Sequence, residues 1–218
     1  MNFILKRKEE TNVSYEDIVH LIHKSFEDRL KQGLKFTCSF LTVEEYKKDT
    51  AKGTVFVALD KDTQELLGTA TVNVKKDIYG VTYGYNEYVA IAPKAQRQGI
   101  ASQLLKECEK IVKEAGAEYI FSDTAVEAKS SIQYHLKNGF KIIGLHSYPS
   151  TNYYSYFFRK QLVPSKKWNS NLYCKYAFLK SYIITKLTLR KDGHKTFLAS
   201  LFKKKKKKES IIYGNSHS

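Results

Sequence analysis

The chain has 218 residues and a net charge of +15, with 42% apolar and 13% aromatic residues. This composition can bury one good core plus an appendage and does not require two full domains. The three cysteines include no Cys-x-x-Cys pair, which argues against a disulfide framework and against a zinc site, so no metal is expected. No stretch approaches the roughly 20 apolar residues that span a bilayer, and the sequence predicts a cytoplasmic protein.

The charge is distributed unevenly along the chain. From residue 165 onward there are 14 Lys and Arg against two acidic residues, and six of these lysines form the run 203–208. The positive charge therefore belongs to the C-terminal segment. We predict one domain over residues 1–163 and a basic extension over residues 164–218, which is helical at first and disordered in its lysine-rich end.

The first part of the chain predicts a strand followed by two helices. A short apolar run within residues 1–8 is typical of a first strand. Ser14 marks the start of an amphipathic helix that ends at Gly33. Thr42 and Glu45 form a capping-box pattern, which predicts a second, short helix.

The next elements are predicted to be strands. Residues 55–59 and 66–74 read as strands, and the polar stretch between them indicates an antiparallel hairpin. Gly80 and Gly84 then predict a second turn, which leads to a strand over residues 87–92.

This strand breaks at Pro93 into a polar, glycine-bearing turn, and the turn opens an amphipathic helix over residues 100–115. The first four N–H groups of a helix lack partners inside the helix and point one way, so an anion placed there gains hydrogen bonds and a favourable dipole. Gly99 and Ala101 leave room for a phosphate to approach closely. A glycine at such a turn can also serve packing alone.

Further strands and a helix complete the pattern. We predict a buried strand over residues 119–122, a helix over 130–137, and strands over 141–145 and 153–160. A strand, the glycine-turn helix and a second strand form a βαβ unit with a right-handed crossover, so the strands at 87–92 and 119–122 are expected to be parallel at the centre of a mixed sheet. The fold class is α/β.

Two segments carry a resemblance to a known family. Gln96, Gly99 and Ala101 fill the pattern Gln/Arg-x-x-Gly-x-Gly/Ala, and residues 128–140 follow a second pattern that ends in Gly-Phe. These segments resemble the two signatures of the GNAT family of N-acetyltransferases. The resemblance covers residues 3–162 and implies a bacterial-type GNAT fold, in which helices flank a mixed central sheet, with acetyl-CoA as cosubstrate.

The resemblance also implies a cofactor site. In this family the amides of the turn hold the CoA diphosphate, and the preceding strand binds the pantetheine arm through its backbone. Ala128 replaces the asparagine that usually contacts the cofactor. Cofactor binding is therefore assigned to Val89, Ala90, Ile91, Gln96, Arg97, Gln98, Gly99, Ile100, Ala101 and Ser102.

Three side chains are candidates for acyl-transfer chemistry. Glu87 stands where many family members carry a glutamate that takes the amine proton, and it is the first candidate for the general base, although a glutamate at a strand start is ordinarily a solvated charge. His135 occupies the position that often holds a tyrosine near the CoA sulfur, and Tyr134 precedes it. Either ring could protonate the leaving thiolate, and His135 could instead pack between helix and sheet.

These assignments predict an enzyme that passes the acetyl group of acetyl-CoA directly to a primary amine. Ser131, Ile132 and His135, with residues 150–154, resemble small bacterial acetyltransferases of cell-surface polysaccharide assembly, which implies an amino sugar or its nucleotide-linked form as the acceptor. The alternatives are another small amine, a protein amino group, or a non-catalytic acyl-CoA-binding module on the same fold. A homodimer is compatible with the sequence.

The extension contains a second amphipathic pattern, with interleaved lysines. One interpretation is that residues 172–208 dock on an anionic membrane surface, at the inner face of the cell membrane. The other is that this helix packs against the catalytic domain and the lysine run is solvated. A specific nucleic-acid site is not expected, because the aromatic residues form no stacking sheet. The apolar positions at helical spacing are Leu172, Tyr176, Leu179, Ile183 and Leu187.

Overall fold

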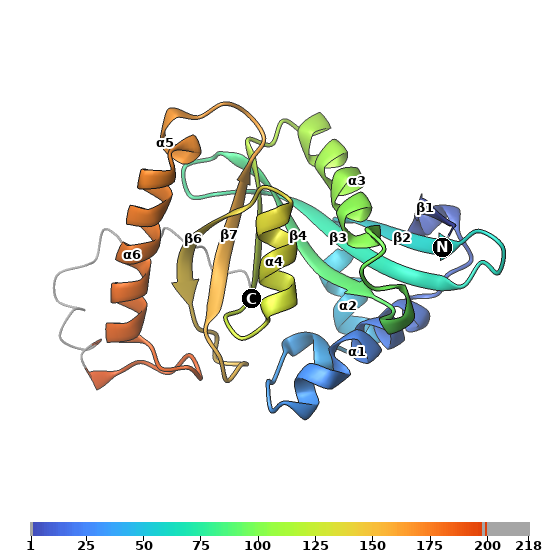
Figure 1. Ribbon diagram of the computed structural model, residues 1–218, viewed down its shortest axis with the longest axis horizontal. Coiled ribbons are helices and arrows are strands. Elements are labelled where there is room, and N and C mark those ends of the chain that lie inside the picture. The colour runs from blue at the N-terminus through green and yellow to red at the C-terminus, as the bar shows by residue number, and fades with distance from the viewer. Residues whose placement is uncertain (1, 198, 200–218) are drawn as a thin grey trace. The chain divides into compact units, whose positions relative to one another are not determined.

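The computed structural model describes residues 2–197 and 199, and its chain trace is drawn in Figure 1. These residues divide into two compact units. Within the described residues, the first comprises 2–74 and 84–115, and the second comprises 75–83, 116–197 and 199. The predicted lysine run over residues 203–208 lies outside the described residues.

The first unit is built on four strands in the order β1-β2-β3-β4. β1 pairs with β2 and β2 with β3, both antiparallel, so the predicted hairpin is confirmed. Its strands are β1 (Phe3–Arg7), β2 (Thr54–Asp60), most of β3 (Leu66–Lys76) and most of β4 (Thr82–Ile91). Its helices are α1 (Tyr15–Lys31), α2 (Val43–Thr50) and α3 (Ile100–Glu114), with short turns η1 (Lys8–Glu10), η2 (Thr37–Ser39) and η3 (Pro93–Ala95).

Both predicted helix starts in this unit are confirmed, because each has a complete capping box. The Ser14 hydroxyl accepts a hydrogen bond from the Asp17 amide at 3.0 Å, and the Asp17 carboxylate accepts one from the Ser14 amide at 2.9 Å. Thr42 and Glu45 make the same reciprocal pair at α2. Each box satisfies amides that have no partner inside the helix.

The prediction of a turn at Gly84 was wrong, because β4 begins at Thr82 and Gly84 is a buried residue within it. A Cβ at Gly84 would lie 2.5 Å from a methyl group of Val112. The glycine therefore serves the close approach of α3 to the strand, not a turn. The predicted amphipathic helix is present, and its buried face includes Leu104, Leu105, Cys108 and Val112.

The second unit contains three strands in the order β5-β7-β6, and β7 pairs antiparallel with both β5 and β6. They are β5 (Tyr119–Ala125), β6 (Lys141–His146) and β7 (Ser155–Gln161), and the helices are α4 (Lys129–Lys137), α5 (Lys166–Asn169) and α6 (Asn171–Thr188). Ile120, Phe140 and Phe158 are buried at its core, each at most 2% exposed. Burying such a side chain contributes about 1.5–3 kcal/mol.

Helix α6 packs against β6 through small polar side chains. The Ser181 hydroxyl lies 2.9 Å from the Leu145 amide and 3.0 Å from the Leu145 carbonyl oxygen, to which Thr185 also donates at 2.7 Å. A Cβ at Gly144 would lie 3.0 Å from the Ser181 oxygen, so the glycine permits this close contact. The predicted helix in the extension is thus present and belongs to the second unit.

The capping box of α1 can be tested by replacing its hydroxyl. Ser14→Ala removes the acceptor for the Asp17 amide and should lower the free energy of unfolding by about 1 kcal/mol. Urea denaturation followed by circular dichroism measures this change. Ser130→Ala, at an exposed position of α4, is the control and should not lower stability. An equal effect of the two substitutions would show that the box contributes nothing specific.

Candidate functional site

The turn between β4 and α3 has an unusual helix start. Gly99 is the N-cap of α3 and adopts a left-handed conformation with φ +82°, and no side chain caps the helix. The starts of α1 and α2 are instead occupied by Ser14 and Thr42. A Cβ at Gly99 would meet nothing within 4 Å. The first turn of α3 therefore faces open space, without a side-chain oxygen of its own to compete with an external anion.

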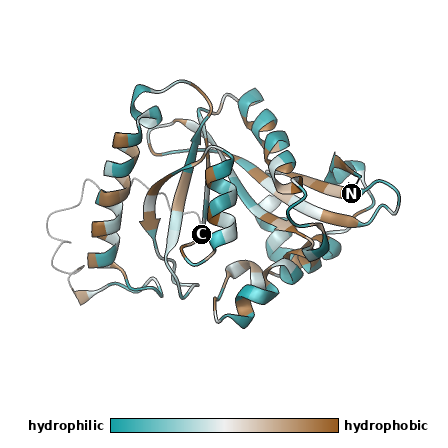
Figure 2. Ribbon diagram, in the orientation of Figure 1, coloured by the Kyte–Doolittle hydropathy of each residue, from teal (hydrophilic) through white to brown (hydrophobic). Residues whose placement is uncertain are grey.

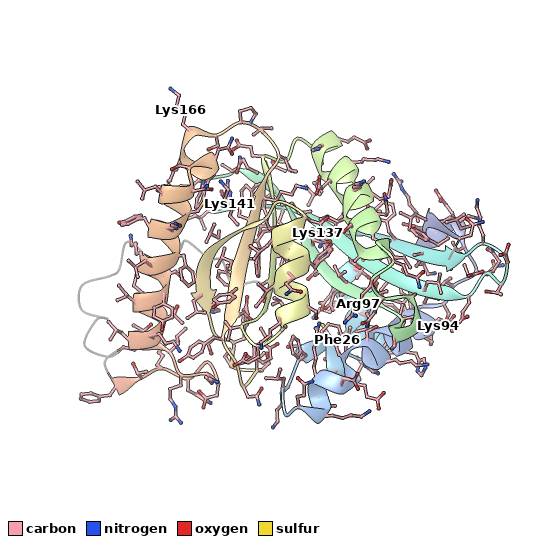
Figure 3. The ribbon with its side chains drawn as sticks, viewed as in Figure 1. Phe26, Lys94, Arg97, Lys137, Lys141 and Lys166 are labelled. Carbon is pink, nitrogen blue, oxygen red and sulfur yellow. The ribbon has the colours of Figure 1, made fainter. Side chains whose placement is uncertain are left out.

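Two cations project from the same turn, as Figure 3 shows for Lys94 and Arg97. Lys94 forms an ion pair with Glu65, which neutralises its charge. Arg97 is exposed, has φ +63°, and makes no ion pair with any residue that the structure describes. Its guanidinium is thus the available positive charge beside the helix start, and it is suited to bidentate contact with a phosphate.

Close packing beneath the turn positions it. A Cβ at Gly68 would lie 2.7 Å from Ile91 and 3.2 Å from Ile100, so only glycine lets β3 approach both residues. The Ala92 amide donates to the Leu67 carbonyl oxygen at 2.8 Å. Sequence reasoning missed Gly68, although an isolated glycine in a strand is the signal of such an approach.

The ten predicted cofactor residues lie on one continuous segment of the first unit. Three end strand β4, four form the turn, and three begin α3. Ile100 is 1% exposed, so its side chain belongs to the core. In chain order the residues are Val89, Ala90 and Ile91, then Gln96, Arg97, Gln98 and Gly99, then Ile100, Ala101 and Ser102.

Glu87 lies on β4, four residues before the strand ends, and is partly buried. Its carboxylate accepts a hydrogen bond from the side-chain amide of Asn73. The same amide lies 3.4 Å from the Asp49 carbonyl oxygen, and a Cβ at Gly53 would lie 2.5 Å from the Asn73 side-chain oxygen. Asn73 is 5% exposed and is therefore held by its surroundings. A donated amide bond orients the carboxylate and stabilises its negative charge.

Strand β4 is irregular beside Glu87. Tyr88 has φ +53°, a left-handed conformation that in a strand indicates a bulge. Its hydroxyl donates to the Asp49 carboxylate at 2.6 Å, and its ring packs edge-on against Tyr46 at 5.1 Å. These contacts hold the strained residue. A bulge redirects the backbone that follows it, which here leads through Val89 to the glycine turn.

Asn86, the residue before Glu87, is 1% exposed, and neither polar atom of its side chain has a hydrogen-bond partner. A buried carboxamide without partners costs about 1–3 kcal/mol, and native proteins retain one where a water or a ligand completes the bonding. The side chain of Asn86 can thus still donate and accept hydrogen bonds, one residue before the candidate base Glu87.

His135 lies on α4 in the second unit and is 4% exposed. Its Nδ1 donates to the Ser131 carbonyl oxygen at 2.7 Å, and its Nε2 accepts from the Ser122 hydroxyl at 3.0 Å. The ring stacks on Phe158 with centroids 4.4 Å apart. Burial lowers the pKa of His135 to about 4, although the bond to Ser131 acts in the opposite direction. At neutral pH the ring is therefore uncharged, and both of its nitrogens are engaged.

Tyr134 lies one residue earlier on the same helix, about 100° around its axis. It is partly exposed, whereas His135 is buried. Its ring contacts that of His135 edge-on, with centroids 5.0 Å apart. The two candidate acids therefore differ in access to solvent and to a ligand.

Other groups in the described residues are not among these candidates. Cys108 is fully buried on α3, and burial raises the pKa of its thiol. A cavity of about 770 Å³ in the first unit is lined by residues that include Lys6, His20 and Lys94, but Glu87 does not line it. No group of three or more His, Cys, Asp or Glu side chains within residues 2–197 and 199 is placed to hold a metal ion.

Comparison with known proteins agrees with the fold. A family model described as acetyltransferase (GNAT) family matches residues 15–140 of the chain. No curated protein sequence matches the chain. Many solved structures share the fold at low sequence identity.

Three of these structures illustrate the likeness. The NatC complex bound to Gag peptide and CoA contains a chain with 14% identity and a TM-score of 0.60, and the match covers 75% of this chain and 100% of that chain. A GNAT acetyltransferase from Staphylococcus aureus Mu50 has 14% identity and a TM-score of 0.58, with 74% and 99% covered. A GNAT acetyltransferase from Elizabethkingia anophelis with acetyl-CoA bound has 16% identity and a TM-score of 0.53, with 74% and 99% covered.

The predicted α/β acetyltransferase fold is confirmed by these matches, and so is acetyl-CoA as the cosubstrate. The family match spans more than half of the chain and includes the glycine-capped turn. The chain therefore belongs to the GNAT acetyltransferase family and is an acetyl-CoA-dependent acyltransferase.

Proposed function

We propose that this protein transfers the acetyl group of acetyl-CoA directly to the primary amine of a small acceptor, with Glu87 as the general base. The observation that carries the proposal is the carboxylate of Glu87, held by the buried amide of Asn73 on the strand that leads to the glycine turn. A fixed, partly buried carboxylate can take the proton that an ammonium group must lose before it attacks a thioester.

The turn fits the diphosphate of CoA. The open space at Gly99, the uncapped start of α3 and the uncompensated charge of Arg97 together suit a doubly anionic group. Val89, Ala90 and Ile91 would hold the pantetheine arm through their backbone. Binding geometry then supplies much of the rate acceleration, because two reactants are brought together in a fixed orientation.

The chemistry needs no covalent enzyme intermediate. Cys108, the buried thiol on α3, has a raised pKa and faces the core, which makes it a poor nucleophile. The nitrogen of the acceptor attacks the thioester carbonyl carbon, its proton passes to Glu87, and the C–S bond breaks to release CoA. A protonated group beside the leaving thiolate assists this last step.

We propose Tyr134 for that proton donor and His135 for a positioning role. His135 is neutral at physiological pH, and the proton on Nδ1 is committed to the Ser131 carbonyl oxygen. The bond to Ser122 and the stack on Phe158 instead fix the orientation of α4 against its sheet. Tyr134, on the neighbouring face of α4, is partly exposed, whereas His135 is buried.

For the acceptor we propose an amino sugar or its nucleotide-linked form. This assignment rests on the likeness of Ser131, Ile132, His135 and residues 150–154 to acetyltransferases of cell-surface polysaccharide assembly. A panel of nucleotide amino sugars, polyamines and peptides with a free N-terminus, assayed by release of free CoA thiol, identifies the acceptor. Release of CoA in the absence of any added amine would instead favour a hydrolase. If no amine of the panel causes CoA release, an acyl-CoA-binding module would be favoured.

The glycine turn can be tested with a matched pair of substitutions. Gly99→Ala and Gly116→Ala both place a methyl group in open space at positive φ, at opposite ends of α3, and should cost about 1 kcal/mol of stability each. Only Gly99→Ala should also weaken acetyl-CoA binding, by about tenfold, because its methyl group enters the anion site. Isothermal titration calorimetry measures both affinities. Equal affinities for the two variants would exclude the turn as the diphosphate site.

The base assignment predicts a specific kinetic defect. Glu87→Gln keeps the shape of the side chain but cannot accept a proton, so turnover at neutral pH should fall by about 10²–10⁴-fold. The affinity for acetyl-CoA should be unchanged. Glu44→Gln, at an exposed position of α2, is the control and should retain full activity. The assignment fails if Glu87→Gln turns over like the wild type.

The proposed roles of Tyr134 and His135 can be distinguished by the pH dependence of turnover. Tyr134→Phe should lower the maximal turnover and abolish the loss of activity at high pH that titration of an acid produces. His135→Phe should keep the pH profile of the wild type, because it removes no proton donor. Pre-steady-state and steady-state measurement of CoA release over pH 6 to 10 supplies both profiles. A changed profile in His135→Phe alone would reverse the two assignments.

His135 also predicts a pH dependence of stability. Its pKa in the folded protein is about 4, below the ordinary value of 6.5, so the unfolded chain binds a proton more readily between these values. The contribution of the neutral His135 ring to the free energy of unfolding is therefore fully present above pH 6.5. It is lost as the pH falls toward 4, by at most about 3 kcal/mol. In His135→Phe this part of the pH dependence should vanish. Urea denaturation at several pH values tests the slope, whatever the absolute stability of the variant.

A further inference from the structure

Helix α6 is apolar on the side that faces away from its sheet. Five exposed residues, called here the apolar stripe, recur every three or four positions and so share one side of the helix. Figure 2 shows hydrophobic residues repeated along the whole length of α6. The stripe consists of Leu172 (79% exposed), Tyr176 (58%), Leu179 (56%), Ile183 (48%) and Leu187 (39%).

The apolar stripe does not face the sheet, because the opposite side of α6 makes the contacts with it. Ser181 and Thr185 are hydrogen-bonded to Leu145 of β6. Cys174 is 4% exposed and packs with Ile143 and Phe157. The predicted packing of this helix against the rest of the chain therefore uses its other face, and the apolar positions found in the sequence are left on the surface. An apolar stripe along a helix is normally covered by another surface.

The charge around the stripe has one sign. Helix α6 contains Lys175, Lys180 and Lys186 and has no acidic residue. Lys175 and Lys180 make no ion pair with any described residue, and Lys186 lies 3.8 Å from the centre of the Tyr154 ring. Lys166 projects from α5, just before α6, as Figure 3 shows. A partner for this face must therefore supply apolar area and negative charge together.

These two requirements exclude two of the partners considered. A second copy of the chain would bring the lysines of α6 against those of its twin, with no carboxylate on the helix to pair with them. A nucleic acid would match the lysines with phosphates but would leave the apolar stripe in water. The surface of an anionic bilayer supplies phosphates above and hydrocarbon below.

We propose that α6 docks lengthwise on an anionic membrane surface. The helix is about 27 Å long, and the stripe lies at the boundary between headgroups and acyl chains while the lysines contact lipid phosphates. Within the described residues no helix is long and apolar enough to cross a bilayer, so this contact is peripheral. The basic residues that follow α6 in the sequence add attraction of the same sign.

Cosedimentation of the full chain with lipid vesicles tests this proposal. Vesicles of phosphatidylcholine alone are compared with vesicles in which one third of the lipid is phosphatidylglycerol. The double variant Leu179→Asp, Ile183→Asp removes the centre of the stripe. The double variant Ile78→Asp, Tyr79→Asp is the control, because it makes the same change in charge at exposed apolar positions of the second unit.

We expect the wild type to partition onto the anionic vesicles and not onto neutral ones. The stripe variant should partition at least about tenfold more weakly than the control. Circular dichroism and acetyl-CoA affinity should be unchanged in both variants, because all four positions are exposed. Equal partitioning of the two variants would overturn the proposal, as would absence of binding by the wild type. A dimer in sedimentation velocity that only the stripe variant loses would assign the face to a second copy instead.

Discussion

The left-handed backbone of Gly99 is the constraint on which the functional site depends. It ends the turn after β4 and starts α3 without a side-chain cap, so the helix presents its first amides and its positive dipole to the exterior. Other features of the first unit serve this arrangement. Gly68 lets β3 approach Ile91 and Ile100, and Gly84 lets α3 approach β4. The turn is thus held from below by contacts that only glycine permits, while its upper side remains open.

Buried polar pairs organise the candidate chemistry in each unit. In the first, the amide of Asn73 holds the Glu87 carboxylate, and in the second, Ser122 and the Ser131 carbonyl oxygen hold the ring of His135. Burial disfavours the charged form of either group, so the two sites differ through their surroundings and hydrogen-bond partners. A carboxylate that accepts an amide hydrogen bond keeps a stabilised charge, whereas a buried imidazole next to aromatic rings loses its charge. Helix α4 thus carries a buried, uncharged histidine next to a partly exposed tyrosine.

The C-terminal helix shows how one sequence pattern can serve two faces. Its apolar residues at helical spacing predict an amphipathic helix, which is present, but small polar residues make the contact with β6. The larger apolar residues are left to the surface, among lysines. Acyl transfer does not require this arrangement, and it is consistent with an enzyme that works next to an anionic surface.

The sequence by itself determined the order of the elements, the two capping boxes, the glycine turn and the family, because these depend on residues close together in the chain. It also predicted Glu87, Tyr134 and His135 as candidate catalytic residues. Only the tertiary structure decided that Gly84 lies within a strand, that Asn73 holds Glu87, that His135 is neutral and which side of α6 is exposed. Each of these depends on contacts between residues far apart in the chain, such as Gly84 with Val112 or His135 with Phe158. Burial and hydrogen bonding between distant segments leave no periodic trace in the sequence, so local patterns could not predict them.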